Sequence, residues 1–224
     1  MKISVLGTGS KGNCIILTNT DGKFIVLDCG LKYERITTND DFTGFENLSF
    51  VFVSHMHSDH SMAMKQFILA GSKVYYWDSE PRKVNRVDNF EFAFFRVKHN
   101  VANRGIIIKD LLTNEIYVYV VDFCEMPKIN GVDHWIYEVN WDEETINKKI
   151  MEEGADFRHI HSGLCNHNSL ENALEYFSGL DKKPKNIFIA HRSKDHGNEK
   201  RIQTQMKKFA DNVEVLKRGM VIEI

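Results

Sequence analysis

The sequence predicts an α+β protein in which two β-sheets pack face to face and helices cover their outer surfaces. Three observations support this prediction. Short apolar runs typical of strands cluster early in the chain, amphipathic helical segments interleave with strands later, and no linker, repeat or low-complexity tract separates them. We therefore expect residues 1–224 to form one domain.

The composition is that of an ordinary globular protein, with 42% hydrophobic and 27% charged residues. A net charge of −2 argues against a strongly basic nucleic-acid coat, although a local basic groove remains compatible with it. No apolar run is long enough to cross a bilayer and no signal-peptide pattern opens the chain, so we expect a cytoplasmic protein without a membrane partner. The four cysteines lack paired spacing and suggest neither disulfides nor a cysteine zinc site.

The chain begins with a strand over residues 1–6 and a glycine-rich turn. Gly7, Gly9 and Gly12 match the dinucleotide fingerprint G-x-G-x-x-G, which requires a helix to open at the last glycine. Residues 14–18 are instead β-rich, and a turn at 19–22 leads into a second strand at 24–28. Because no room remains for a helix, we predict a β-hairpin and reject a dinucleotide-binding loop at these glycines.

The remaining elements follow from periodicity. Apolar runs or alternation predict strands at 48–53, 74–77, 90–97, 104–108, 116–122, 135–139, 187–190 and within 213–224. Helical spacing predicts helices at 62–69, 142–153, 170–177 and 200–210. Asn168 or Ser169 is placed to cap the third of these helices, and Gly154 to stop the second.

A histidine cluster follows the predicted strand 48–53. His55, His57, Asp59 and His60 lie within six residues. Imidazole and carboxylate are ligands that zinc and similar divalent cations prefer. In an extended chain His55 and His57 point the same way and can hold one ion, whereas Asp59 and His60, past the bend, can face a second. A histidine-rich surface loop is the alternative.

Three further candidate ligands each follow a predicted strand. They are His99, Asp122 and His191. A polar residue after an apolar strand is common for solubility, but together with the histidine cluster the three complete a ligand set for two metals. A carboxylate such as Asp122 can bridge two ions.

The order H-x-H-x-D-H, followed by a His, an Asp and a His, resembles the metallo-β-lactamase fold superfamily. Other stretches resemble, more narrowly, its YycJ/WalJ-like branch and phage-encoded relatives; they are residues 9–14, 27–30, 138–140, 166–171 and 191–193. The resemblance implies an αββα four-layer sandwich of two mixed sheets, with both metals at one edge.

The resemblance also implies how the ligands divide. His55, His57 and His99 would hold one ion, Asp59, His60 and His191 the other, and Asp122 would bridge them. The expected cofactors are two divalent ions, Zn²⁺ first and Mn²⁺ as the alternative. Asp28 would be a buried group that steadies the histidine loop, or simply a satisfied turn carboxylate.

The expected function is metal-dependent hydrolysis. We hypothesise a phosphodiesterase, a nuclease acting on DNA or RNA, that uses a hydroxide bridging the two ions. Asp59 would orient this nucleophile, and His167, paired with Glu138 as in phosphodiesterase members of the superfamily, would protonate the leaving oxygen. Helix capping or surface exposure for His167, and a structural ion pair for Glu138, are the alternatives.

Two other functions are compatible with the sequence. The first is a cyclic-nucleotide phosphodiesterase, an activity of some phage-borne superfamily members, and the second is a metal-binding module without catalysis. The substrate would be a nucleic acid or a cyclic nucleotide. If the protein is phage-encoded, it would act in the host cytoplasm. A homodimer is also expected as an option, because dimers are common in the superfamily. Candidate phosphate-holding residues are Lys98, Arg104, Arg158, Arg192 and Lys194. The other histidines are expected to have loop or packing roles; they are His134, His159, His161 and His196.

Overall fold

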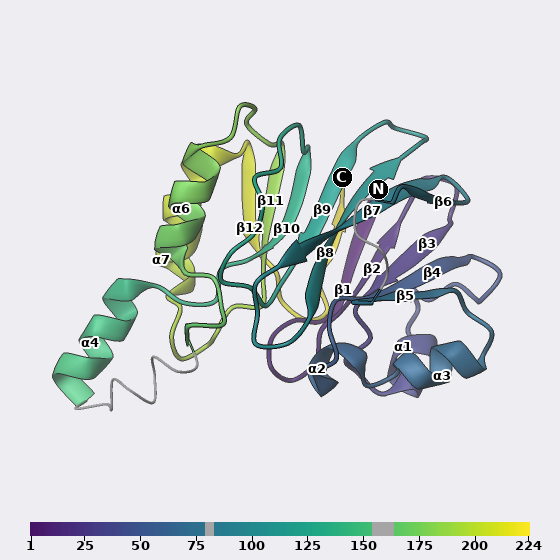
Figure 1. The fold of residues 1–224 in the computed structure, drawn as a ribbon, viewed down its shortest axis with the longest axis horizontal. Coiled ribbons are helices and arrows are strands. Elements are labelled where there is room, and N and C mark those ends of the chain that lie inside the picture. Colours follow the sequence, from purple (N-terminus) through teal and green to yellow (C-terminus); the bar gives the residue numbers. More distant parts are fainter. Residues whose placement is uncertain (79–82, 154–163) are drawn as a thin grey trace.

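Two mixed β-sheets lie face to face at the centre of the molecule (Figure 1). The structure is a computed structural model that describes residues 1–78, 83–153 and 164–224. Within these residues the first sheet has the strand order β13-β1-β2-β3-β4-β5 and the second β12-β11-β10-β9-β8-β7-β6. The strands of the first sheet are β1 (Lys2–Gly7), β2 (Cys14–Thr18), β3 (Phe24–Leu27), β4 (Leu48–Val53), β5 (Val74–Tyr76) and β13 (Val221–Glu223). Those of the second are β6 (Asn85–Val87), β7 (Phe90–Val97), β8 (Asn103–Asp110), β9 (Ile116–Val120), β10 (His134–Glu138), β11 (Asn186–Ala190) and β12 (Asn212–Val215).

Helices flank the sheets on both sides, with α1 and α3 beside the first sheet and α6 and α7 beside the second (Figure 1). The described helices are α1 (Tyr33–Thr37), α2 (Ser58–Ser61), α3 (Met64–Leu69), α4 (Glu143–Glu153), α6 (Leu170–Ser178), α7 (Glu199–Met206) and the 3₁₀ turn η1 (Lys207–Phe209). None of them is long and apolar enough to cross a membrane.

Three hydrophobic clusters separate these layers. Between the sheets, the rings of Phe50 and Phe92 stack with centroids 4.2 Å apart. A second cluster joins the outer face of β9–β12 to α6 and α7, and a third joins β2–β4 to α1 and α3. Each sheet therefore buries both faces, which confirms the predicted α+β sandwich.

Most predicted elements are present. β2 and β3 pair antiparallel, so the hairpin is confirmed. The helix expected at 62–69 is α3, which begins at Met64. The amide of Ala63, just before it, donates to the Cys29 carbonyl at 2.9 Å and separates α3 from the short helix α2. Ser169, not Asn168, caps α6, since its side chain accepts from the amide of Asn172. The helices α1 and α2 and the strand β6 were not predicted from the sequence.

Strand direction brings distant residues to one edge of the sandwich. β9, β10 and β11 are parallel, and β7 has the same direction because β7–β8 and β8–β9 are both antiparallel. The carboxyl ends of these four strands therefore meet at one edge of the second sheet. In the first sheet β3 and β4 are likewise parallel and end together.

Candidate metal centre

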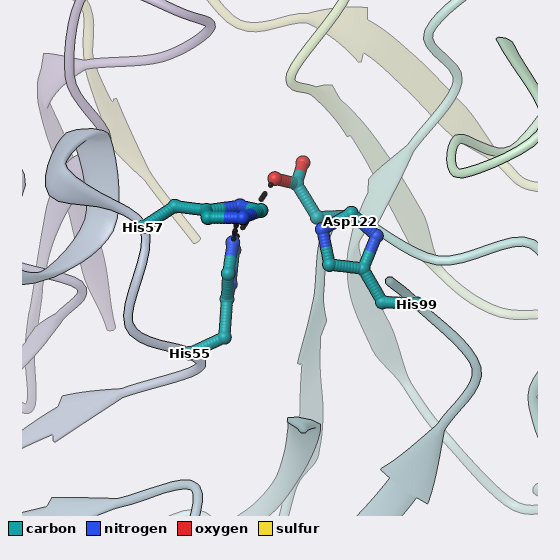
Figure 2. Close-up of side chains that lie close together, drawn as sticks. All are labelled: His55, His57, His99 and Asp122. Carbon is teal, nitrogen blue, oxygen red and sulfur yellow. Dashed lines mark hydrogen bonds and ion pairs between the residues drawn. The ribbon is translucent and has the colours of Figure 1, made fainter. Parts of the chain in front are cut away.

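The first group of candidate ligands joins the two sheets. His55 and His57 follow β4, His99 follows β7 and Asp122 follows β9, and one ligand atom from each lies within 4.8 Å of the others (Figure 2). His55 Nε2 is 2.9 Å from His57 Nδ1 and 3.4 Å from Asp122 Oδ2. The His99 ring lies 5.0 Å from that of His55 and 5.3 Å from that of His57.

The second group shares one residue with the first. Its members are Asp59, His60, His191 and Asp122. His60 Nε2 lies 3.4 Å from Asp59 Oδ2 and 3.2 Å from Asp122 Oδ2. The structure thus brings together all seven ligands expected from the sequence, with Asp122 common to both groups.

Glu138 and His167 lie beside Asp122 and His191. His167 Nδ1 is 2.8 Å from Glu138 Oε1, and the His167 ring stacks on that of His191. Glu138 is fully buried and accepts hydrogen bonds from the amides of Phe123 and Asn168. The pair therefore belongs to the centre, where Glu138 also lies 3.0 Å from His191 Nδ1.

Hydrogen bonds from Nδ1 to a neighbouring oxygen orient four of the histidines. In each case Nδ1 lies near an oxygen, in the pairs His55–Ser54 Oγ (3.1 Å), His60–Asp28 Oδ2 (2.6 Å), His99–Asn166 O (3.0 Å) and His191–Glu138 Oε1 (3.0 Å). Donation from Nδ1 leaves Nε2 with a free lone pair. Among the described residues, Nε2 of His99 and Nε2 of His191 are buried without a hydrogen-bond partner. Such orphaned acceptors fit a bound cation.

Asp28 anchors the histidine loop through hydrogen bonds to Ser54 and His60. It is fully buried and accepts hydrogen bonds from the Ser54 amide (2.7 Å), the Ser54 hydroxyl (3.0 Å) and the Tyr119 hydroxyl (2.6 Å), besides its contact with His60. Tyr119 comes from β9 of the other sheet. Asp28 therefore links both sheets to one ligand.

Backbone contacts fix the position of α2. The amide of Cys29 donates to the His60 carbonyl and the amide of Asn13 to the Asp59 carbonyl, at 2.8 and 2.7 Å. At Gly30 a Cβ atom would lie 1.6 Å from the Asp59 carbonyl oxygen. Since no side chain fits there, this glycine permits the close approach of the two segments.

Three residues of the centre have a left-handed backbone. Asp28, Asp122 and His191 have φ of +57°, +55° and +50°, and each follows a strand closely. This region is sparsely populated by residues other than glycine, and such residues concentrate at functional sites. The sharp turn at each position directs a side chain across the strand ends.

Carboxylate charge dominates the electrostatics of the centre. Burial acts to lower the pKa of His60, but the carboxylates of Asp28 and Asp122 raise it well above its usual value. Burial acts to raise the pKa of Asp122, yet His191 and His60 hold it well below its usual range. His99, in contrast, is half-buried and forms no ion pair with a described carboxylate; burial lowers its pKa to about 4. The negative charge that attracts protons to His60 would equally attract a divalent cation.

Sequence reasoning missed several residues that contact the ligands. The Asn13 side-chain nitrogen lies 2.9 Å from His60 Nε2, and that of Asn140 donates to the His191 carbonyl at 2.7 Å. Both lie in stretches that carry the family resemblance, which was the available signal. Nothing in the sequence distinguishes Tyr119, because the apolar pattern around it is that of any core strand.

Other candidates lie away from the ligands or have partners of their own. Exposed Lys98 pairs with Glu125, and Arg192 donates to the carbonyls of Ser193 and Gly197. His134 begins β10, at the opposite end of that strand from Glu138. Lys194 is exposed and His196 Nδ1 lies near the Ser193 hydroxyl, whereas Arg158, His159 and His161 lie outside the described residues.

Solved structures of other proteins share this architecture. One is the metallo-β-lactamase fold protein YhfI from Bacillus subtilis, with a TM-score of 0.73 and 18% identity over 99% of both chains. The short form of human tRNase Z has a TM-score of 0.61 and 13% identity, over 100% of this chain and 99% of that one. Unliganded yeast PDE1 has a TM-score of 0.65 and 9% identity with the same coverage. No protein-family model and no curated protein matches the sequence.

Proposed function

We propose that this chain, which has the metallo-β-lactamase fold, is a metal-dependent phosphodiesterase that cleaves nucleic acid. The observation that carries the proposal is the position of Asp122. This carboxylate is shared by two groups of metal-ligand side chains and also lies beside the Glu138–His167 pair. A centre for two cations and a residue able to protonate a leaving group therefore adjoin each other.

The ligand set suits two divalent cations. His55, His57 and His99 would hold one, Asp59, His60 and His191 the other, and Asp122 would contact both. When bound, such ions supply a water of lowered pKa and Lewis-acid contacts to a phosphoryl oxygen. We propose zinc as the native metal, because imidazole and carboxylate ligands suit it; manganese is the alternative.

His167 is placed to protonate the leaving oxygen. Its Nδ1–H donates to Glu138, so Nε2 is the ring atom available to carry a proton to substrate. Burial acts to lower the pKa of His167, but the Glu138 carboxylate raises it above the usual value and so favours the protonated ring. About a quarter of the side chain is exposed (24%), which leaves it accessible. An alkoxide is a poor leaving group, and a phosphodiesterase gains from such an acid.

Asp59 has a second role in this proposal. Its side chain is 26% exposed and approaches both His60 and His191. The carboxylate can therefore accept a hydrogen bond from an attacking water while it holds a cation. Burial acts to raise the pKa of Asp59, but the neighbouring His191 and His60 rings lower it below its usual range, so the group stays ionised.

The solved structures support a hydrolase. Two proteins of the same fold are named tRNase Z and PDE1. Within the fold we propose a relationship to the YycJ/WalJ-like branch, on the motifs of residues 9–14, 27–30 and 166–171, and we propose that residues 1–224 act as one catalytic domain.

Metal analysis combined with a substrate panel tests the proposal. The purified protein is depleted with chelator, reloaded with Zn²⁺ or Mn²⁺, and its bound metal is measured. The panel contains single- and double-stranded DNA, RNA, 3′,5′-cyclic nucleotides, bis(4-nitrophenyl) phosphate, a thiolester and a chromogenic β-lactam. We expect two metals per chain and cleavage of nucleic acid and of the nitrophenyl diester.

Two results would overturn the proposal. Turnover of cyclic nucleotides without polymer cleavage would assign the enzyme to small substrates. Full metal binding without turnover of any phosphodiester would make the chain a metal-binding module. A matched control is His57→Ala, which removes one ligand and is expected to lose metal and activity together.

A further inference from the structure

Two arginines lie directly opposite each other at one end of the second sheet. Arg96 of β7 and Arg104 of β8 are register partners in the antiparallel ladder. Two positions along, Phe94 and Ile106 are also partners, and both belong to the cluster between the sheets. Because side chains on a strand alternate, Arg96 and Arg104 emerge on this same inner face. Their Cβ atoms should be about 5 Å apart.

Within the described part of the chain, no ion pair neutralises the charge of this arginine pair. No carboxylate of the described residues forms an ion pair with either guanidinium, and Arg104 Nε is buried without a hydrogen-bond partner. Burial and the neighbouring charge of Arg96 lower the pKa of Arg104, with Asp78 acting in the opposite direction. Like charges directly opposite on neighbouring strands destabilise a sheet. The pair therefore lacks a structural explanation among the described residues.

The arginine pair adjoins the metal centre. Arg96 lies three positions before His99 at the end of β7. The Arg104 amide donates to the carbonyl of Ser54 at 3.1 Å, and Ser54 directly precedes His55. Both arginines are thus next to strand ends that present ligands of the first group. Arg96 is exposed and Arg104 is half-buried, so solvent-borne ligands can reach the pair.

We infer that Arg96 and Arg104 bind a second phosphate of the substrate, next along the chain from the phosphate at the metal centre. The inference rests on the proposed function and narrows its substrate to a polynucleotide. Guanidinium groups recognise phosphate oxygens with paired N–H donors, and a neighbouring low-dielectric surface strengthens such contacts. A 3′,5′-cyclic nucleotide has one phosphate, which the metal centre would take, and leaves the arginine pair unused.

Binding without turnover tests this inference first. Fluorescein-labelled single-stranded DNA and RNA oligonucleotides are titrated by anisotropy in EDTA, over a range of NaCl concentrations. The variants are Arg96→Gln, Arg104→Gln and the double variant. The control is Arg86→Gln, which removes the same charge from an exposed residue of β6 opposite Glu91. We expect Kd to rise about tenfold per arginine of the pair, and the salt slope to fall by about one for each.

Turnover provides the second readout. In the double variant with zinc, the loss of kcat/KM on an oligonucleotide should exceed the loss on bis(4-nitrophenyl) phosphate by about tenfold or more. Arg104→Lys keeps the charge and should restore most of the salt slope, which separates phosphate binding from a fault in folding.

The outcomes distinguish this inference from the proposed function. A double variant that binds oligonucleotides as the Arg86→Gln control does would overturn the inference, and so would equal losses on the oligonucleotide and the nitrophenyl diester. If the wild type cleaves no phosphodiester, the proposed function fails. Weakened binding confined to the Arg96 and Arg104 variants would still support a polynucleotide site.

Discussion

His167 is the residue whose chemistry is most directly testable. In His167→Gln, zinc content should stay unchanged, because the ring is absent from both groups of expected ligands. The kcat on nucleic acid should fall by about 10²–10⁴, the usual contribution of a general acid. The kcat on the nitrophenyl diester should fall much less, because nitrophenolate is a good leaving group that needs no protonation. Equal losses on both substrates would remove His167 from the acid role.

Asp28 should control metal affinity without touching metal. Asp28→Asn keeps the size and tolerates the left-handed backbone, but it weakens the acceptor that orients His60. We expect zinc affinity to fall by about 10- to 100-fold, as for other groups that support a ligand. Competition with a chelator measures this change. Tyr119→Phe, which removes one donor to Asp28, is the matched control and should have a smaller effect.

At the scale of single elements, the close contact between α2 and the segment after β3 can be tested by substitution. Gly30→Ala places a methyl group against the Asp59 carbonyl and should cost about 3 kcal/mol or more of unfolding free energy. Gly179→Ala is the control, because the nearest atom to its Cβ lies at an ordinary 3.6 Å. Urea denaturation compares them. Equal unfolding free energies of the two variants would contradict the prediction, because they would mean that α2 can shift to make room for the methyl group.

The start of β10 has a pH-sensitive residue far from the centre. His134 is buried, and burial lowers its pKa although Glu115 opposes the shift. At this position the folded chain therefore binds fewer protons than the unfolded chain once the pH falls below the ordinary histidine pKa. The contribution of His134 to stability should fall as the pH falls from there through the lowered folded value. His134→Gln should flatten this part of the curve of unfolding free energy against pH; an unchanged curve would contradict the assignment.

Helices and strands were predictable where a local pattern of apolar residues determines them. The apolar run of β4 and the alternation of β7 were visible in the sequence, so the strands that present His55 and His99 could be located. The break between α2 and α3 could not, because it depends on a hydrogen bond to Cys29, more than 30 positions away. Likewise, the ligand types were readable, whereas the contact of Tyr119 with Asp28 depends on how the two sheets stack.

For the whole molecule, the division of ligands between the sheets links metal binding to stability. His55 and His60 follow β4 of the first sheet, whereas His99, Asp122 and His191 follow strands of the second. Bound cations should therefore hold the sheets together and raise Tm. Free metal at 100 times its Kd would add about 2.7 kcal/mol. Calorimetry with chelator and with added zinc measures the shift, which should shrink in His57→Ala. A Tm indifferent to zinc would contradict the proposed centre.

The left-handed positions have an evolutionary consequence. Asp28, Asp122 and His191 each adopt a backbone that glycine tolerates best, and each costs of order 1–3 kcal/mol. Laboratory selection for heat resistance of the metal-free protein would thus favour glycine at Asp122 and His191 and erase the activity. Selection that also demands turnover would keep all three and gain its stability elsewhere. The centre marks where durability and chemistry compete in this chain.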